Sequence, residues 1–301
     1  MASNQSVHQS LRLKVTDACN LSCRFCHKEG GSKSTPVTIS QVRQIADFAS
    51  RNGFGSIHLT GGEPTLHSDL DLLVKEVKKY DLVCALTTNG QFDYKLLTVL
   101  RDAGLDSLNF SVHTVRPSAW SQIQKNVDKQ IAAFKISHTL VNIEEAVKLG
   151  FLVKINTVVG DDPELAIEVV NALSQTGVHI RLLDVLGSRI SKMNIQKVLN
   201  HFRAKKTMKT RNPYSSKACT YYRLFNGETI VTKILRLYRL PLLCEGCQLK
   251  CLEGFYGLRI ESDGDDIYVR LCLQRNDSQA RMKLEQFVCS DMLTEITKIS
   301  Q

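Results

Sequence analysis

Residues 11–30 decide how this chain folds, and they read Leu-Arg-Leu-Lys-Val-Thr-Asp-Ala-Cys-Asn-Leu-Ser-Cys-Arg-Phe-Cys-His-Lys-Glu-Gly. Apolar residues at Leu11, Leu13 and Val15 alternate with polar ones, which predicts a half-buried strand that ends at residues 16–17. Three cysteines follow this strand directly, in a C-x3-C-x2-C spacing, on a segment that we expect to be a loop. The loop can fold around a compact object.

The three cysteines, Cys19, Cys23 and Cys26, indicate a metal centre. Three thiolates so close together suit a soft metal, and three rather than four leave one coordination position for a small molecule. The alternatives are a tetrahedral zinc site, a disulfide with a spare thiol, or reduced cysteines packed as small hydrophobic groups. Structural zinc usually takes four ligands in paired short spacings, so the unequal spacing and Phe25 before the last cysteine favour an iron–sulfur cluster.

Composition indicates a globular cytoplasmic protein. A chain of 301 residues with 43% hydrophobic content can bury one large core, or a core and a smaller unit. No apolar run approaches the ~18 residues that span a membrane, and the first ten residues lack the apolar stretch of a signal peptide. Ten cysteines in the cytoplasm indicate metal ligands rather than disulfides. The net charge of +9 favours an anionic partner, such as a phosphorylated metabolite or nucleic acid, although many basic proteins simply carry solvated lysines.

Strand and helix patterns alternate along the next 175 or so residues. After the first strand we expect strands at 56–60, 82–88, 107–114, 152–159 and 179–186, and helices at 38–52, 70–80, 94–103, 140–149, 163–175 and 194–204. Six strand–helix units predict an α/β fold with a parallel sheet, either curled into a barrel or open and doubly wound. In both cases the chemistry lies beyond the carboxyl ends of the strands.

The ends of the second and third strands carry candidate binding residues. Gly61-Gly62-Glu63-Pro64 would let a ligand approach the backbone closely, or it forms only a tight turn. Thr87 and Thr88 could hydrogen-bond a carboxylate or a ribose, or they belong to a plain turn.

Polar side chains also share faces of later strands. The period of two places Asn109, Ser111 and His113 on one face, and Lys154 and Asn156 on another, while Arg181 lies near the start of the sixth strand. If these faces line a barrel, they imply a ligand, and an anionic substrate would pair the buried Lys and Arg. Exposure to solvent is the alternative.

The composition changes at residue 205. Residues 205–213 form a basic connector that we expect to be a linker, because no aromatic residues are interleaved for nucleic-acid binding. Asn226-Gly227 predicts a hairpin, and Asp263-Gly264 another. A second cysteine group comprises Cys244, Cys247, Cys251 and Cys272, and its spacing alone fits structural zinc as well as a second iron–sulfur cluster. Cys84 is expected in the core, and Cys219 and Cys289 have no assignable role.

The motif Cys19-x-x-x-Cys23-x-Phe25-Cys26 after a strand resembles the signature of the radical S-adenosylmethionine (radical SAM) superfamily. The resemblance implies a [4Fe-4S] cluster on these cysteines, whose fourth iron chelates SAM. It implies that SAM is split to a 5′-deoxyadenosyl radical, which takes a hydrogen atom from the substrate. It further implies a partial (β/α)6 radical SAM barrel over residues 1–207, a C-terminal auxiliary-cluster domain over residues 208–301, and a second [4Fe-4S] cluster.

Within the superfamily the chain resembles the GTP 3′,8-cyclases, well over residues 11–187 and more loosely to residue 274. Leu-Thr-Gly-Gly-Glu-Pro-Thr (59–65), Leu-Thr-Thr-Asn-Gly (86–90) and Val-Lys-Ile-Asn-Thr-Val (153–158) carry this resemblance. It implies a basic substrate site made by Arg12, Lys154, Arg181 and Arg259. It also implies a SAM site that includes Phe25, Gly61, Gly62, Glu63, Thr87, Thr88, Ser111 and Asn156, and an auxiliary cluster on Cys244, Cys247 and Cys272 with an open iron for the substrate base.

The departures from the cyclases concern substrate handling. Residues 248–251, Gln-Leu-Lys-Cys, stand where the cyclases carry an Asn-Arg-x-Arg run, and His67 stands in place of an arginine. The chain ends in Lys298-Ile-Ser-Gln301, where the cyclases end in Gly-Gly. We infer that this chain kept the radical chemistry and changed its substrate, and that Cys251 fills the fourth position on the second cluster.

The expected function is therefore that of a radical SAM enzyme, a cyclase-like lyase or an oxidoreductase. It would abstract hydrogen from a phosphorylated nucleoside-like or sugar-like small molecule and lead to cyclisation, rearrangement or oxidation. A flavodoxin- or ferredoxin-type protein would donate the electron, and we expect neither membrane nor nucleic acid as a partner. The alternatives are a radical SAM enzyme that modifies a peptide, and a non-enzymatic module that binds zinc or nucleic acid.

Overall fold

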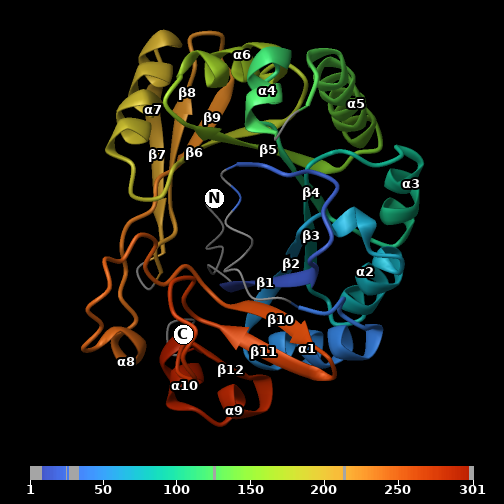
Figure 1. Cartoon of the computed structure of the whole chain (residues 1–301), viewed down its shortest axis with the longest axis vertical. Coiled ribbons are helices and arrows are strands. Elements are labelled where there is room, and N and C mark those ends of the chain that lie inside the picture. The colour runs from blue at the N-terminus through green and yellow to red at the C-terminus, as the bar shows by residue number, and fades with distance from the viewer. Residues whose placement is uncertain (1–8, 25, 27–33, 125–126, 213–214, 298–301) are drawn as a thin grey trace, which may run out of the picture.

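The computed structural model of the chain describes residues 9–24, 26, 34–124, 127–212 and 215–297. In these residues all strands belong to a single sheet, in the order β12-β11-β10-β1-β2-β3-β4-β5-β6-β9-β8-β7. The sheet curves into a ring with helices on its outer side (Figure 1). Its two edge strands, β12 and β7, do not pair with each other, so the ring is a partial barrel.

Six parallel strands form the centre of the sheet. They are β1 (Gln9–Thr16), β2 (Phe54–Gly61), β3 (Val83–Thr88), β4 (Ser107–Ser111), β5 (Leu152–Val159) and β6 (His179–Asp184). The helices that follow these strands are α1 (Ile39–Arg51), α2 (Leu70–Lys78), α3 (Lys95–Asp102), α4 (Pro117–Ile123), α5 (Lys129–Lys148), α6 (Glu164–Leu173) and, after β6, α7 (Arg189–His201), with a short 3-10 turn, η2 (Pro64–Leu66). The predicted parallel α/β barrel is confirmed.

The alternation seen in the first strand sorts its side chains between two environments. Leu11, Leu13 and Val15 are fully buried in the core between the sheet and the outer helices, so the residues between them face the inside of the ring. Helix α1 begins where the sequence predicts, because Thr38 accepts a hydrogen bond from the amide of Gln41 and the Gln41 side chain accepts one from the amide of Thr38. The strand pattern therefore decides which residues can reach a ligand in the barrel.

The C-terminal third of the chain extends this sheet at both ends. β10 (Arg259–Asp263) pairs in parallel with β1 and continues into β11 (Asp266–Arg270) and β12 (Arg281–Lys283). On the other side, β9 (Thr229–Lys233) pairs in parallel with β6, and β8 (Ala218–Arg223) and β7 (Lys205–Arg211) follow. Both predicted hairpins are confirmed, with Gly227 and Gly264 at φ of 90° and 60°. Helices α8 (Pro241–Cys244), α9 (Leu284–Val288) and α10 (Asp291–Thr297) complete the described chain.

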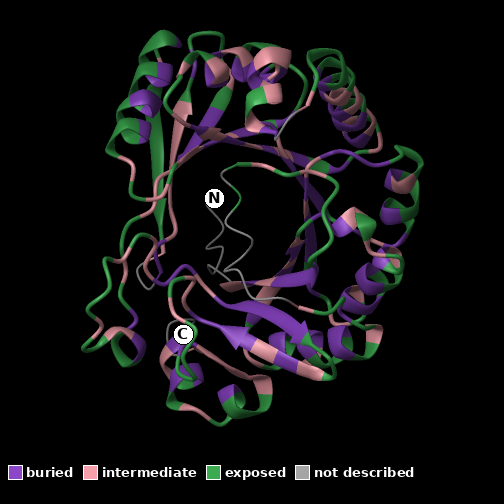
Figure 2. Cartoon of the chain, viewed as in Figure 1, coloured by how far each residue is buried: buried purple, intermediate pink, exposed green. Residues whose placement is uncertain are grey.

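Three expectations about single elements were wrong. Residues 205–211 are not a linker but the edge strand β7, all of whose residues are exposed (Figure 2). Its lysines suit an edge strand, because charged side chains there oppose further pairing. Helix α5 begins at Lys129 rather than at residue 140, and α7 begins at Arg189 rather than at residue 194. The boundary expected at residues 207/208 falls inside β7, and the two-domain division stays a prediction.

Across the described part of the chain, no helix combines the length and the apolar character that crossing a membrane would require.

Candidate active site

The cysteine loop after β1 is held against the turn after β2 by backbone contacts. The amide of Gly62 donates to the carbonyl of Thr16 at 2.8 Å, and the amide of Glu63 donates to that of Ala18 at 2.7 Å. A Cβ atom on Gly62 would lie 2.3 Å from the carbonyl oxygen of Ala18. The glycine is therefore needed because another part of this chain approaches it, immediately before Cys19.

The buried carboxylate of Glu63 stabilises this turn by accepting hydrogen bonds. Its side chain is 1% exposed, and its carboxylate accepts hydrogen bonds from the hydroxyls of Thr88 (2.7 Å) and Thr65 (2.8 Å) and from the amide of Asn89 (2.7 Å). Burial raises the pKa of Glu63, and these hydrogen bonds lower it in part. The side chains of Glu63 and Thr88 thus bind each other, which leaves the backbone of the turn as the part that can face a ligand.

Gln124, at the end of α4, supports the cysteine loop from the other side. Its amide nitrogen donates to the sulfur of Cys23 at 2.9 Å, and its oxygen accepts from the amide of Ser22 at 2.9 Å. Burial raises the pKa of Cys23, the hydrogen bond from Gln124 lowers it in part, and the nearby Cys26 and Cys19 raise it further. Three thiolates near one another are mutually repulsive, and a bound iron–sulfur cluster would compensate that charge. The donor set therefore fits the cluster that the sequence predicts, while Phe25 lies outside the described residues.

The inner face of the barrel carries a group of cations that we call the basic cluster: Arg12, Lys154, Arg181, Lys217, Lys233 and Arg259. Strand register places Arg12 beside Arg259, and Asn156 beside both Ser111 and Arg181. Arg181 donates to the oxygen of Asn109 at 2.5 Å, and burial lowers its pKa, while the nearby Tyr256 raises it in part. All four basic residues that the sequence predicted are thus brought together on one surface.

Tyr256 lies at the centre of three of these cations. Its ring centroid is 5.2 Å from the Nζ atom of Lys217, 4.7 Å from that of Lys233 and 5.6 Å from the guanidinium carbon of Arg259. Burial raises the pKa of Tyr256, but the cations outweigh it and bring the pKa down to about 8. Tyr256, Lys217 and Lys233 could not be predicted from the sequence. The place of Lys233 depends on the pairing of β9 with β6, that of Lys217 on the segment directly before β8, and that of Tyr256 on the chain between β9 and β10.

The charge of the basic cluster affects neighbouring groups. Burial and then the charges of Arg12, Lys217, Lys154 and Lys233 lower the pKa of His58 to about 3, so its ring is neutral. Burial and the charge of Arg181 lower the pKa of Lys154. Like charges gathered in a barrel are costly unless an anion pairs with them, so this surface is suited to binding one.

The remaining predicted residues lie near the carboxyl ends of the strands. Thr87 pairs in register with Asn109 on the inner face, and Ser111 lines a small pocket together with Cys23 and His113. The ring of His113 accepts a hydrogen bond from the amide of Val158, and burial lowers its pKa to about 4. Cys84 is fully buried in the core, as expected. Direct contact of any of these residues with SAM stays a prediction.

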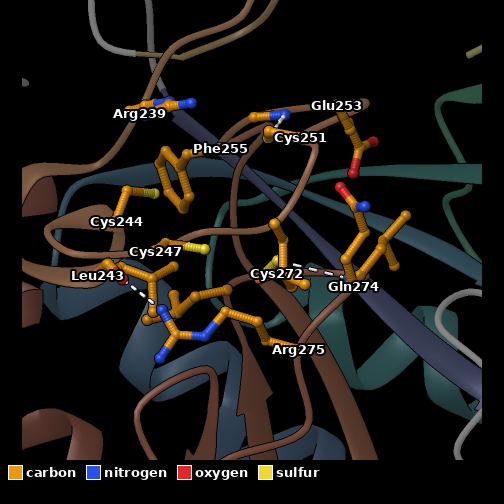
Figure 3. Close-up of a pocket in the computed structure, with 14 residues that line it drawn as sticks. Arg239, Leu243, Cys244, Cys247, Cys251, Glu253, Phe255, Cys272, Gln274 and Arg275 are labelled. Atoms are coloured by element: carbon orange, nitrogen blue, oxygen red, sulfur yellow. Dashed lines mark hydrogen bonds between the residues drawn. The ribbon is translucent and has the colours of Figure 1, made fainter. Parts of the chain in front are cut away.

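The second cysteine group lines one pocket, which we call the cysteine pocket. Cys244, Cys247, Cys251 and Cys272 all border it, together with Arg275 and Phe255 (Figure 3). Burial raises the pKa of Cys244, and the nearby thiols of Cys251, Cys272 and Cys247 raise it further. Among the described residues, no three His, Cys, Asp or Glu side chains converge on the position of a single metal ion. The four sulfurs instead border a shared space, and an all-thiolate donor set is the one that iron–sulfur clusters use.

These features define a class of protein: a partial α/β barrel with a three-cysteine loop after its first strand, a glycine turn packed on that loop, and a polar interior. The model of the radical SAM superfamily matches residues 13–173, which is more than half of the chain. The chain belongs to the radical SAM superfamily and is accordingly an enzyme that uses SAM and a [4Fe-4S] cluster.

Comparison with known proteins agrees with this assignment. The chain is 28% identical over 281 residues to the probable GTP 3′,8-cyclase of Pyrococcus horikoshii, covering 89% of this chain and 84% of that protein. The structure of Streptococcus suis SuiB bound to S-adenosylmethionine superposes with a TM-score of 0.64 and 17% identity, over 96% of this chain and 65% of SuiB. The structure of anSMEcpe with bound AdoMet and the Kp18Cys peptide gives a TM-score of 0.64 and 16% identity, over 97% of this chain and 83% of that one. The two structures establish the likeness of fold.

Proposed function

We propose that this enzyme abstracts hydrogen from a phosphorylated nucleoside-like or sugar-like small molecule, giving cyclisation, rearrangement or oxidation. The observation that carries the proposal is the basic cluster on the inner face of the barrel. Its members repel one another, and an anionic substrate that pairs with them relieves this repulsion. Its binding free energy is therefore more favourable than on an ordinary basic surface. The relatives named as GTP 3′,8-cyclases support a nucleotide as the first substrate to test.

Two groups of residues would hold the cofactors. Cys19, Cys23 and Cys26 would hold the cluster, which when bound supplies the electron that splits SAM. The turn at Gly61 and Gly62 would bind the methionine part of SAM through its backbone. These two groups of residues meet at the hydrogen bonds that join the cysteine loop to the turn, so their relative positions are set before SAM binds.

The basic cluster would bind and orient the substrate. Arg181 and Arg259 can present forked pairs of N–H groups to a phosphate, whereas Lys154 acts as a point charge. Arg259 already pairs with Glu253 at 2.7 Å, so a phosphate that reaches it competes with a carboxylate. Arg181 donates to the neutral oxygen of Asn109, so we expect Arg181 to contribute more to affinity.

The alternative substrate is a peptide. The likeness to anSMEcpe with its bound peptide supports it through fold alone, and the basic cluster does not favour a neutral peptide over an anionic metabolite. The other alternative, a non-enzymatic module for zinc or nucleic acid, is wrong because the chain belongs to an enzyme superfamily. A flavodoxin- or ferredoxin-type electron donor and a cytoplasmic location remain part of the proposal.

The test is anaerobic reconstitution with iron and sulfide, followed by SAM and a panel of deuterated nucleotides and sugar phosphates. We expect label to appear in 5′-deoxyadenosine with at least one phosphorylated compound. Arg12→Met, Lys154→Met, Arg181→Met and Arg259→Met should each weaken binding of that compound about 10- to 100-fold, because a hydrogen bond to a charged group contributes ~1.5–3 kcal/mol. Lys75→Met, which removes an exposed lysine on α2, is the matched control. Unchanged affinity in all four variants, with SAM cleavage intact, would remove the nucleotide interpretation.

A further inference from the structure

One segment, residues 251–256, contributes side chains to the cysteine pocket and, at its end, a side chain that contacts the basic cluster. Cys251, Glu253 and Phe255 border the cysteine pocket (Figure 3). Tyr256, the next residue, lies among the cations of the basic cluster. Phe255 and Tyr256 also border a separate cavity of about 250 Å³ beside Lys217. Cys251 therefore lies in the cysteine pocket five residues before a residue that contacts the basic cluster.

Hydrogen bonds hold Cys251 and Cys272 in the same pocket although 21 positions of sequence separate them. The side chain of Gln274 accepts a hydrogen bond from the amide of Leu252 at 2.9 Å and donates one to the carbonyl of Lys250 at 3.0 Å. It is thus hydrogen-bonded to both residues adjacent to Cys251. The amide of Gln274 donates to the sulfur of Cys272 at 3.4 Å. The amide of Gly254 donates to the sulfur of Cys251 at 3.1 Å. Amides directed at sulfur stabilise a thiolate, which is the form that binds iron.

Glu253, which borders the cysteine pocket, is paired with a member of the basic cluster. Glu253 pairs with Arg259 of the basic cluster at 2.7 Å, and both side chains are largely buried, at 12% and 7% exposed. A substrate that extended from the basic cluster into the cysteine pocket would have to displace this carboxylate. An anionic substrate would meet electrostatic repulsion from Glu253 on that path.

We propose that Cys251 is the fourth ligand of the second cluster, so that this cluster has four cysteine ligands and presents no open iron to substrate. The substrate would then be held by the basic cluster alone, and the second cluster would be restricted to exchanging electrons. Of the proposed function this inference uses only the choice of GTP as the probe, and it departs from the open auxiliary cluster that the resemblance to the cyclases implied.

The experiment isolates the second cluster in the full-length chain. In a background variant with Cys19, Cys23 and Cys26 all replaced by Ala, anaerobic reconstitution should give about four irons and four sulfides per chain. Mössbauer and electron paramagnetic resonance spectra of this protein should not change when GTP or cyanide is added. Cys251→Ala in the same background should create one distinct iron site, and its spectra should change on addition of cyanide. Cys289→Ala, an exposed cysteine outside the cysteine pocket, should behave as the background does.

Three results would overturn the proposal: spectra of the background protein that shift with GTP or cyanide, a Cys251→Ala spectrum identical to that of the background, or zinc without sulfide in the pocket. Cys251→Ser keeps a weaker oxygen ligand, and its spectra should be intermediate between those of the background protein and those of Cys251→Ala. Circular dichroism melting of the metal-free proteins separates loss of a ligand from loss of the fold. SAM cleavage by the parent enzyme is measured separately, so failure of the proposed function would be distinguishable from failure of this ligand assignment.

Discussion

Gly62→Ala should prevent assembly of the first cluster by displacing the cysteine loop. The added Cβ atom would lie 2.3 Å from the carbonyl oxygen of Ala18 and 2.6 Å from that of Asp17, and an ordinary contact begins at 3.4 Å. The loop must therefore move by about 1 Å at the position directly before Cys19. Two backbone hydrogen bonds, from the amides of Gly62 and Glu63, join the same two segments. Their loss costs about 0.5–1.5 kcal/mol each, or about 1–3 kcal/mol together.

The assay for this variant has two readouts. Thermal unfolding of the metal-free protein should show a midpoint lowered by roughly 2–12 °C, at about 2–4 °C for each kcal/mol in a chain of this size class. Iron bound after reconstitution, in a background that lacks Cys244, Cys247, Cys251 and Cys272, should fall well below the parent value. Gly160→Ala is the matched control, because no atom lies within 4 Å of its added Cβ, and it should change stability by less than about 1 kcal/mol. Full iron content and an unchanged midpoint in Gly62→Ala would refute the reasoning.

Three further outcomes are expected. Tyr256→Phe keeps the ring but removes the ionisable hydroxyl. In the parent the phenolate that forms above a pKa of about 8 offsets one positive charge, so titration calorimetry should show GTP affinity falling several-fold more from pH 7 to pH 9 in the parent than in the variant. Because folding lowers this pKa below its usual value of ~10, the parent should also gain stability over the variant as pH rises above about 8; equal pH profiles would contradict the assignment. Gln124→Leu removes the hydrogen bond to Cys23 and should slow iron incorporation without abolishing it, and unchanged kinetics would argue against a supporting role. Arg270→Met leaves its buried partner Glu261 with less compensation and should lower the free energy of unfolding in urea by about 3–5 kcal/mol, whereas a loss below 1 kcal/mol would show that Arg270 is dispensable.

The central barrel could be predicted from sequence because its signals are local. Alternating residues such as Leu11 and Leu13, and the capping pair at Thr38, each specify one element without reference to distant parts of the chain. The twelve-strand sheet could not be predicted, because β10 pairs with β1 across about 250 residues and β9 pairs with β6 in parallel. The start of α5 was missed because that part of the helix exposes side chains such as Phe134, at 69%, and carries a weak apolar stripe.

The same difference between local signals and long-range pairing explains which residues of the site could be predicted. Arg12, Lys154 and Arg181 lie on strands whose inward faces follow from the period of two, so their meeting was predictable. Lys233 obeys the same period on β9, two residues after the register partner of Arg181, but this matters only once the pairing of β9 with β6 is known. Tyr256 lies on no regular element, and no periodicity could have placed it.

The position of residues 251–256 also bears on how such an enzyme can diverge. If Cys251 ligates the second cluster and the basic cluster binds substrate, mutations at Tyr256 act on the same short peptide that carries Cys251, so substrate specificity and iron chemistry would change together. Natural variation in this stretch should therefore be concerted, with exchanges at one end accompanied by exchanges at the other.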